Sequence, residues 1–251
     1  MYSSFSFSFD NQIVEKLTDT DFYKFTMSYF IWKYYPGIKV RFSFKNRTDS
    51  VRLAEIVPED QLRRQLNAVR KLRFSVTELA HIGGTFSYGN QPIFDQAWVR
   101  DLQTLELPEC HVEKMPDGQY DIWVEGEWWQ VTLWEIYIMA IVNELRTIAT
   151  LEPMMRMEQL RVVASGINRL AEKITFLRKF PAIIFSEFGT RRRAFREWQR
   201  FVDGMLLDSF ANTKQFRGTS NVLFAHDFEM VPMGTSAHEL LMVVASLYDD
   251  E

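Results

Sequence analysis

Hydrophobic and polar residues alternate one by one over residues 38–47 of the chain. A period of two places every second side chain on the same face, so this stretch predicts a β-strand with one buried face. Two further strands are predicted at residues 111–115 and 119–124, because Pro116-Asp117-Gly118 between them is a hairpin turn signal. Residues 127–131 read as another strand. Together these segments predict a mostly antiparallel sheet.

Apolar residues recur at the three- and four-residue spacing of helices over most of the remaining chain. The Thr and Asp residues at 18–21 offer N-caps for the first helix, which Pro36-Gly37 ends. The segment Ser75-Val76-Thr77-Glu78 has the form of a capping box at the start of a shorter helix. Helices are therefore predicted at residues 22–35, 58–72, 75–83, 92–105, 133–149 and 153–179.

From residue 181 a different pattern repeats three times: a short strand, a Gly-Thr pair and a helical segment. The pairs are Gly189-Thr190, Gly218-Thr219 and Gly234-Thr235. Glycine frees the backbone to turn or to approach a ligand, and Thr or Ser can cap the next helix, whose N-terminus attracts anions. Parallel strands that carry such loops on one rim are typical of α/β barrels, which build their active sites there.

These patterns predict a chain of the α/β class with two parts. Residues 1–132 are expected to form an α+β domain. Residues 133–251 are expected to form two linking helices and the first part of an irregular, incomplete α/β (TIM-like) barrel. A closed barrel takes about 250 residues, whereas about 70 follow the second linking helix. Because three parallel strands cannot close, we expect the chain to be part of a larger barrel and inactive by itself.

Composition narrows the function classes. The net charge of −4 provides no basic field for nucleic acid, and no apolar run reaches the roughly 18 residues of a membrane span. The single cysteine, Cys110, allows no internal disulfide, and the four histidines form no metal-binding spacing with it. The N-terminal residues lack the basic and apolar regions of a signal peptide. We therefore expect a cytoplasmic protein without a bound metal of its own.

Three consecutive arginines, Arg191, Arg192 and Arg193, follow the apolar strand expected at residues 183–185. Guanidinium groups at the end of a buried strand are unfavourable unless an anion or several carboxylates meet them. In an extended run Arg191 and Arg193 point to one side and Arg192 to the other, so at most two of them share a ligand.

Four motifs occur in order along the chain: TDTDFYKFTM, FGTRRR, FRGTSNVLFA and PMGTSAHE. In their order and spacing, from about residue 16 to the end, the chain resembles nicotinate phosphoribosyltransferase, the first enzyme of NAD salvage from nicotinic acid. The resemblance implies formation of nicotinate mononucleotide from nicotinate and phosphoribosyl pyrophosphate, driven by hydrolysis of ATP with Mg²⁺. It also implies a homodimer.

The resemblance assigns roles to individual residues. Tyr23 and Phe188 would sandwich the pyridine ring, with Tyr23 contributed by the neighbouring subunit. Arg191 would lie where an anionic group of substrate or product binds, and Thr235 beside the carboxylate. His238 would be the catalytic histidine that ATP phosphorylates, which suits imidazole, a nucleophile with a pKa near neutrality. The other implied substrate-binding residues are Asp21, Gly189, Thr219 and Ser220.

Outside these motifs the same residue types have ordinary interpretations. An aromatic residue in an aromatic-rich helix is more often part of the core, and a lone histidine is more often structural. We interpret Arg192 and the remaining histidines and tryptophans of note as structural: His81, His111, His226, Trp123, Trp128 and Trp129.

Three alternatives to this function stay open. Relatives that use nicotinamide carry an aspartate at the position of Ser220, where it can accept a hydrogen bond from the substrate amide. The uncharged Ser220 does not repel a carboxylate, which favours nicotinate. The chain is alternatively a non-catalytic or regulatory protein, or one half of a split enzyme whose second polypeptide supplies the rest of the barrel.

Overall fold

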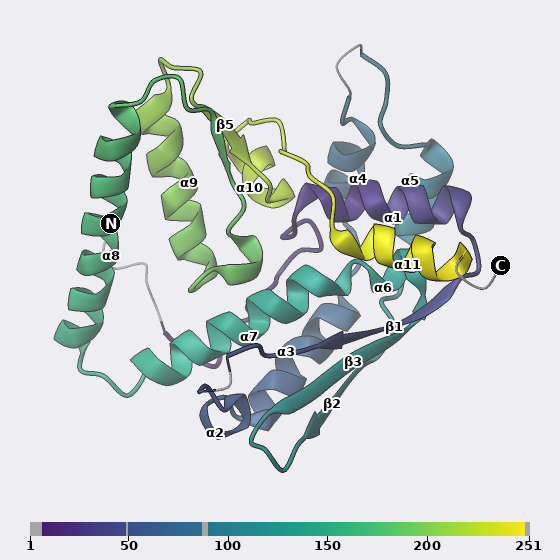
Figure 1. The fold of residues 1–251 in the computed structure, drawn as a ribbon, viewed down its shortest axis with the longest axis horizontal. Helices are drawn as coiled ribbons and strands as arrows, with labels where there is room; N and C mark the ends of the chain where they lie inside the picture. Colours follow the sequence, from purple (N-terminus) through teal and green to yellow (C-terminus); the bar gives the residue numbers. More distant parts are fainter. Residues whose placement is uncertain (1–6, 49, 87–89, 249–251) are drawn as a thin grey trace.

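The computed structural model describes residues 7–48, 50–86 and 90–248. An antiparallel three-stranded sheet in the order β1-β3-β2 forms one side of the molecule (Figure 1). Apolar residues of β1 are half-buried and the alternate polar residues are exposed, which confirms the predicted strand. Gly118 turns the β2–β3 hairpin with a φ of +80°, a conformation that glycine adopts without strain. The strands are β1 (Lys39–Phe44), β2 (Cys110–Lys114) and β3 (Tyr120–Glu127).

The predicted helices are present, with shifted ends. The capping box is confirmed, since Ser75 Oγ accepts a hydrogen bond from the amide of Glu78 and the Glu78 carboxylate accepts one from the amide of Ser75. The helix expected over residues 92–105 is shorter. The helices of this part are α1 (Phe22–Tyr34), α2 (Leu53–Ile56), α3 (Glu59–Lys71), α4 (Val76–Gly83), α5 (Gln96–Gln103), α7 (Trp134–Leu151) and α8 (Arg156–Arg178).

The strand predicted over residues 127–131 is wrong. The chain leaves β3 and forms a short helix, α6 (Trp128–Val131). Trp128 and Trp129 are adjacent in sequence, and both are buried, as is Val131. Adjacent residues of a strand point to opposite faces, whereas one helical turn brings all three toward the same core. The tryptophans therefore pack as a helical turn rather than as residues of the sheet.

Helix α7 belongs to the main hydrophobic core. That core collects buried side chains from Ile13 to Leu145, together with Val222, so it includes residues on both sides of the predicted domain boundary at residue 132. Nearly every turn of α7 contributes a fully buried side chain. In Figure 1 the helix runs between the sheet and the pair formed by α8 and α9 (Arg196–Phe210). Residues on its surface can therefore reach both parts of the molecule.

The barrel-like part has two parallel strands, β4 (Phe185–Glu187) and β5 (Phe216–Thr219). The third predicted strand, before Gly234, is not formed in the described part of the chain. Met233 donates one backbone hydrogen bond to the carbonyl of Thr219 (2.9 Å), but Pro232 has no N–H with which to extend a ladder. The two remaining helices are α10 (Val222–Asp227) and α11 (His238–Tyr248).

A glycine sets the approach of α8 to α9. A Cβ atom at Gly166 of α8 would lie 2.9 Å from Cη2 of Trp198 on α9, which is closer than real Cβ contacts. Gly204 of α9 is different, since a Cβ there would make an ordinary contact of 3.5 Å with Phe228. The first glycine is required by packing, and the second is not.

We predict opposite effects of alanine at these two helical glycines. Gly166→Ala should lower the free energy of unfolding by about 1–3 kcal/mol, because the indole of Trp198 must shift. Gly204→Ala should be neutral or stabilising by up to about 1 kcal/mol, because alanine favours helix. Urea unfolding of both variants measures this difference, and equal losses would contradict the packing argument.

Candidate active site

Two distant loops pair at the centre of the molecule. The loop before α1 and the loop after β5 exchange backbone hydrogen bonds, from Phe22 to the carbonyl of Ser220 (2.8 Å) and from Val222 to the carbonyl of Thr20 (2.9 Å). These bonds join the first motif to the third across about 200 residues of sequence. The first and third motifs therefore lie side by side at this junction.

A buried ion pair ties the second motif to the same junction. Arg193 binds the carboxylate of Asp19 through both terminal nitrogens, at 2.6 and 2.9 Å, and both side chains are shielded from water. Asn221 donates to the same carboxylate (2.8 Å). Burial by itself lowers the pKa of Arg193, but the charge of Asp19, its hydrogen bonds and the charge of Glu144 together outweigh burial and raise the pKa. Removing one partner of such a pair costs about 3–5 kcal/mol, because a buried charge is left alone.

Carboxylates thus meet two of the three arginines. The buried strand expected at residues 183–185 is wrong, since β4 spans Phe185–Glu187 and Ile183 and Ile184 are 41% and 57% exposed. Besides Asp19, Arg193 faces Glu144 (3.5 Å), while Arg191 lies 3.5 Å from Glu135 of α7. Burial nevertheless raises the pKa of Glu144 to about 8, against the opposing charge of Arg193. The run is not extended, since residues Thr190–Arg192 form a single 3-10 turn. The three side chains consequently diverge. Arg192 is exposed to solvent, away from the carboxylates that pair with Arg191 and Arg193.

A cavity of about 650 Å³ opens beside the junction. This is the usual size of a small-molecule site. It lies between α1, β1, α7, the segment after β4 and the start of α11. Six of the residues that the resemblance implicates line it: Asp21, Tyr23, Phe188, Arg191, Thr235 and His238.

Two aromatic rings contribute to this cavity. Phe188 is 38% exposed although it follows a strand, whereas Tyr23 is 3% exposed, so only part of its ring reaches the cavity. Burial, together with the carboxylates of Glu135 and Asp21, raises the pKa of the Tyr23 hydroxyl and keeps it neutral. Both rings belong to one chain in this structure, whereas the resemblance implies that Tyr23 comes from a neighbouring subunit.

Three implicated residues, Gly189, Thr219 and Ser220, do not line the cavity. Ser220 is fully buried and donates a hydrogen bond to Oδ1 of Asp21 (2.6 Å). Asp21 therefore serves this contact and does not cap α1, contrary to the sequence prediction. Burial raises the pKa of Asp21, and the hydrogen bond from Ser220 opposes that rise only in part. Ser220 can act on a ligand only through Asp21.

The other two hold the loops behind the cavity. Thr219 Oγ1 donates to Glu187 Oε2 (2.9 Å), and the other oxygen of Glu187 accepts from the amide of Gly189. A side chain at Gly189 would collide with that carboxylate. Gly218 has a φ of +127°, which favours glycine. The capping expected from Thr and Ser is instead supplied by Asn221, whose side chain accepts from the amide of Phe224.

Sequence reasoning missed a set of charged residues around the cavity. Lys24, which is fully buried, donates to Oε2 of Glu239 (2.6 Å) and pairs with Glu135. The other oxygen of Glu239 accepts from Nε1 of Trp128 (3.0 Å). A lysine in an otherwise apolar segment of α1 was the available signal. The lining residues missed in this way are Arg41, Arg47, Glu135 and Glu239.

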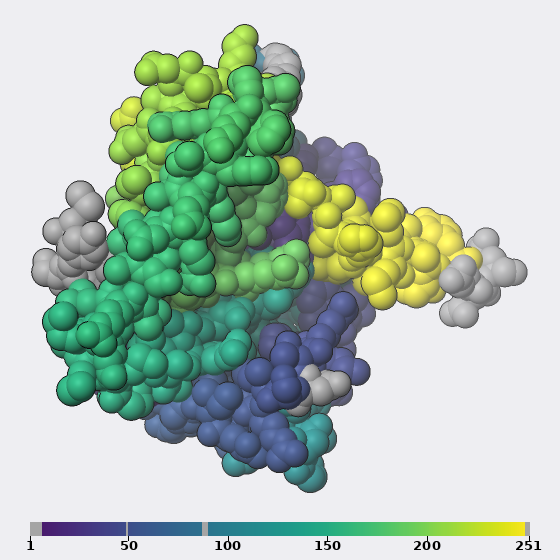
Figure 2. Space-filling view, turned by 60° about the vertical axis from the view of Figure 1, so that its left-hand side comes forward, coloured from purple at the N-terminus to yellow at the C-terminus, as the bar shows by residue number. Residues whose placement is uncertain are grey.

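The helix that carries His238 contacts this lysine through Glu239. None of the described residues of α11 is buried, and Figure 2 shows the helix projecting from the body of the molecule. Its apolar contacts with the main core are partial. The pair between Lys24 and Glu239, one residue beyond His238, is therefore the principal polar anchor of the helix start.

Comparisons with known proteins agree with the motifs. The profile of the nicotinate phosphoribosyltransferase N-terminal domain matches residues 18–143, and the profile of the nicotinate phosphoribosyltransferase family matches residues 183–250. The chain belongs to the nicotinate phosphoribosyltransferase family. The first profile includes the motif TDTDFYKFTM, and the second includes FGTRRR, FRGTSNVLFA and PMGTSAHE.

Solved structures show the same fold. A nicotinate phosphoribosyltransferase from Porphyromonas gingivalis is 26% identical with a TM-score of 0.75, over 94% of this chain and 57% of its own. The enzyme from Vibrio cholerae is 25% identical with a TM-score of 0.75, over 95% and 55%. A structure from Saccharomyces cerevisiae has a TM-score of 0.78 at 24% identity, over 97% and 59%. The chain thus spans somewhat more than half the length of these proteins.

Two further properties of the site region follow from the described residues. No cluster of three or more His, Cys, Asp or Glu side chains there has the arrangement of a metal site. Within the same residues, no helix combines the length and hydropathy that crossing a bilayer requires.

We predict that Lys24→Met loosens the start of α11. Two carboxylates, Glu135 and Glu239, would lose their buried cation, and hydration of Glu239 would pull the helix away from Trp128. Amide hydrogen exchange over residues 238–248 should accelerate by at least about tenfold. Lys33→Met, on the exposed side of the same helix α1, is the matched control and should leave that exchange unchanged. Unaltered exchange in Lys24→Met would show that α11 is held by its apolar contacts alone.

Proposed function

We propose that the chain carries the nicotinate site and the phosphorylated histidine of an enzyme that makes nicotinate mononucleotide. The observation that carries the proposal is the cavity at the junction. It collects Tyr23, Phe188, Arg191, Thr235 and His238, from three separate motifs of the family, around one space of ligand size. Family membership supports the reaction class, which is phosphoribosyl transfer.

In the proposed reaction the ring nitrogen of nicotinate attacks the anomeric carbon of phosphoribosyl pyrophosphate. A carbon–nitrogen bond forms, the bond from carbon to the pyrophosphate oxygen breaks, and its electron pair leaves with pyrophosphate. Phe188 and the accessible edge of Tyr23 supply flat apolar walls for the pyridine ring. The Thr235 hydroxyl donates to the carboxylate, and Arg191 balances an anionic group of substrate or product.

Two arginines that line the cavity beside the proposed site of the pyridine ring suit the phosphates of phosphoribosyl pyrophosphate. Arg41 of β1, Arg47 of the segment after it, and Arg191 all line the cavity. Arg41 is shared with exposed Glu125 (3.3 Å), so it can turn toward a phosphate at little cost. We assign these arginines to the phosphoribosyl pyrophosphate. Mg²⁺ would enter with the phosphates of the substrates, because it commonly binds through them with few protein ligands.

His238 is the proposed phosphoryl acceptor. An imidazole nitrogen would attack the γ-phosphorus of ATP, the bond to ADP would break, and water would later hydrolyse the phosphohistidine. His238 is exposed at the first residue of α11, where unpaired backbone N–H groups favour an added phosphate. Lys24 positions this residue through Glu239 without contacting a substrate.

The choice of nicotinate over nicotinamide rests on Ser220 and Asp21 together. Burial favours the neutral form of Asp21, and the Ser220 hydroxyl occupies one of its oxygens. A neutral group at this position does not repel the carboxylate of nicotinate. The proposal also includes a homodimer located in the cytoplasm, and light scattering of the purified protein tests the dimer.

We predict that Phe188→Ala weakens nicotinate binding to the chain at least about tenfold, because one wall of the ring site is lost. Phe176→Ala is the matched control, since Phe176 of α8 is 57% exposed and lines another surface. Calorimetric titration with nicotinate, and with nicotinamide for comparison, measures both. Binding that is equal in the two variants would place nicotinate elsewhere.

We predict that ATP labels the protein with a phosphate that is labile in acid and stable in base. His238→Ala should abolish the label, because the acceptor nitrogen is gone, and His111→Ala on exposed β2 should retain it. Radiolabelled γ-phosphate of ATP provides the measurement. A label that persists in His238→Ala would assign the phosphoryl group to another residue. Nicotinate binding without any label would favour the non-catalytic alternative.

A further inference from the structure

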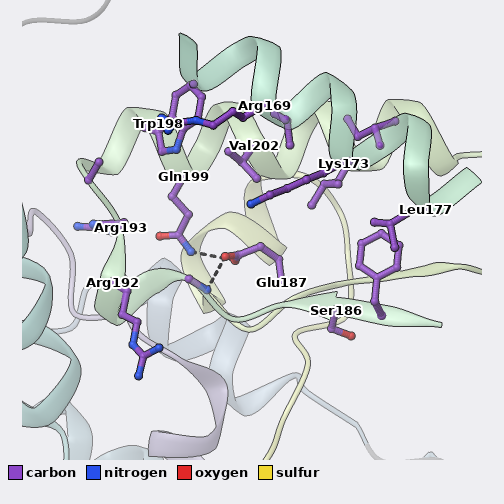
Figure 3. A pocket seen from close by; sticks show the side chains of 17 residues that line it. Arg169, Lys173, Leu177, Ser186, Glu187, Arg192, Arg193, Trp198, Gln199 and Val202 are labelled. Atoms are coloured by element: carbon purple, nitrogen blue, oxygen red, sulfur yellow. Dashed lines mark hydrogen bonds between the residues drawn. The ribbon is translucent and has the colours of Figure 1, made fainter. Parts of the chain in front are cut away.

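Two carboxyl groups lie behind the loops of the candidate active site. Glu187 is the last residue of β4, and Asp203 lies on α9 with no exposed surface. Glu187 lines a second cavity, of about 650 Å³, beside α8 and α9 (Figure 3), whereas the next residue, Phe188, lines the active-site cavity. The two carboxyls therefore belong to the wall that separates the cavities, and the proposed reaction uses neither of them.

Three donors hold Glu187. Its Oε2 accepts hydrogen bonds from the side-chain amide of Gln199 (3.0 Å) and from the hydroxyl of Thr219 (2.9 Å), and its Oε1 accepts one from the backbone amide of Gly189. Figure 3 shows Gln199 directed at this carboxyl. Burial raises the pKa of Glu187, and the three hydrogen bonds oppose that rise, because they favour the charged form.

Asp203 has no such donors. In the described part of the chain, neither of its oxygens has a hydrogen-bond partner. Thr219 lies beside both carboxyls, but its single hydroxyl hydrogen is donated to Glu187. Burial, the charge of Glu187 and a contact with that carboxyl raise the pKa of Asp203 to about 9. Like charges at one site do not ionise together easily, so a proton placed on Asp203 suits both groups.

The charges around the pair do not neutralise it. Asp21, from the loop before α1, adds a negative charge that raises the pKa of Glu187 further. The charged residues Arg217 of β5 and His226 and Asp227 of α10 are exposed. In the described ranges, none of the cations that line the second cavity or belong to α9 pairs with either carboxyl: Arg169, Lys173, Arg192, Arg193, Arg196 and Arg200.

We propose that Asp203 is a positioning residue, whose neutral carboxyl donates a hydrogen bond to Glu187 and so holds the loop at Gly189 in place. One proton thus supports the wall that carries Phe188 and Arg191. When Asp203 loses this proton, two buried like charges face each other without a cation, and the loop is released. This role rests on the proposed function, because the loop carries the ring and anion contacts proposed for nicotinate.

Urea unfolding between pH 6 and 9 tests for the proton. The folded protein holds it from about pH 4 to about pH 9, whereas the unfolded chain does not, so the unfolding constant gains up to about tenfold per pH unit from this residue. Asp203→Asn, which stays neutral and can still donate, should lose this part of the increase. Asp208→Asn, at an exposed position of the same helix, is the matched control and should follow the wild type.

Other buried acids add to the pH dependence. Glu144 is one of them, since burial raises its pKa to about 8. These acids are present in the wild type and in both variants, so the difference between Asp203→Asn and Asp208→Asn measures Asp203 alone.

Trypsin cleavage after Arg191 and Arg192 measures the position of the loop without a ligand. From pH 8 to pH 10, this cleavage relative to cleavage after exposed Arg161 of α8 should rise at least about fivefold in the wild type and stay constant in Asp203→Asn. Nicotinate affinity, measured by calorimetry over the same range, should fall by a similar factor in the wild type only. If no form binds nicotinate, the proposed function is wrong, and the cleavage still decides the role of Asp203.

A reciprocal variant identifies the carboxyl that carries the proton. Glu187→Gln places an NH₂ group among three donors, so it should increase cleavage after Arg191 at least about fivefold at pH 7, whereas Asp203→Asn should not. The proposal is overturned if Asp203→Asn keeps the wild-type pH dependence of unfolding or of cleavage. It is also overturned if Asp203→Asn opens the loop at pH 7 and Glu187→Gln does not.

Discussion

A buried ion pair between a carboxylate and a guanidinium holds the two parts of this protein together. Asp19 precedes the first helix and Arg193 follows the first barrel strand, and their bidentate contact is completed by Asn221 from the second strand's loop. None of these groups is tolerable in the core without the others. Because the three loops are fixed against one another, the residues next to them are fixed too. Asp21 and Arg191 reach their places at the candidate active-site cavity for this reason, and Ser220 reaches its contact with Asp21.

The segment from Phe185 to Ala194, which is fixed at this junction, separates two cavities. Its residues face two different cavities, one lined by the aromatic rings of Tyr23 and Phe188 and one with a largely apolar lining from α8 and α9. The compact 3-10 turn produces this division, because it directs Arg191 and Arg192 apart. Glu187, held by Gln199 and Thr219, anchors the wall between them.

The spacing of apolar residues in the sequence predicted those helices and strands that have one buried and one exposed face. The alternation in β1, the hairpin turn at Gly118 and the capping box at Ser75 are local signals, and the structure confirms them. Errors arose where long-range burial decided the outcome. Trp128 and Trp129 follow one another in sequence, and only their shared core shows that they form a helical turn.

The candidate site was predictable in part for the same reason. Residues inside the motifs could be named, including Tyr23, Phe188 and His238, but partners from other elements could not. Glu135 lies in α7, whose sequence is mostly apolar and indicates only a buried helix. Its ion pairs with Lys24 and Arg191 depend on the packing of α7 against two parts of the fold. Which arginine faces which cavity depends on a 3-10 turn that no periodicity indicates.

The long reach of the Asp19 contacts has a consequence for synthesis of the chain. Its partners lie 174 and 202 residues further along, so most of the polypeptide must leave the ribosome before this carboxylate can be neutralised. Until then the first domain holds an unpaired charge at its centre and an open surface where the later loops belong. Closing such distant contacts is slow, and partly folded chains that wait for them are prone to aggregate. The nascent N-terminal half is therefore the form of this protein in which aggregation competes most directly with folding.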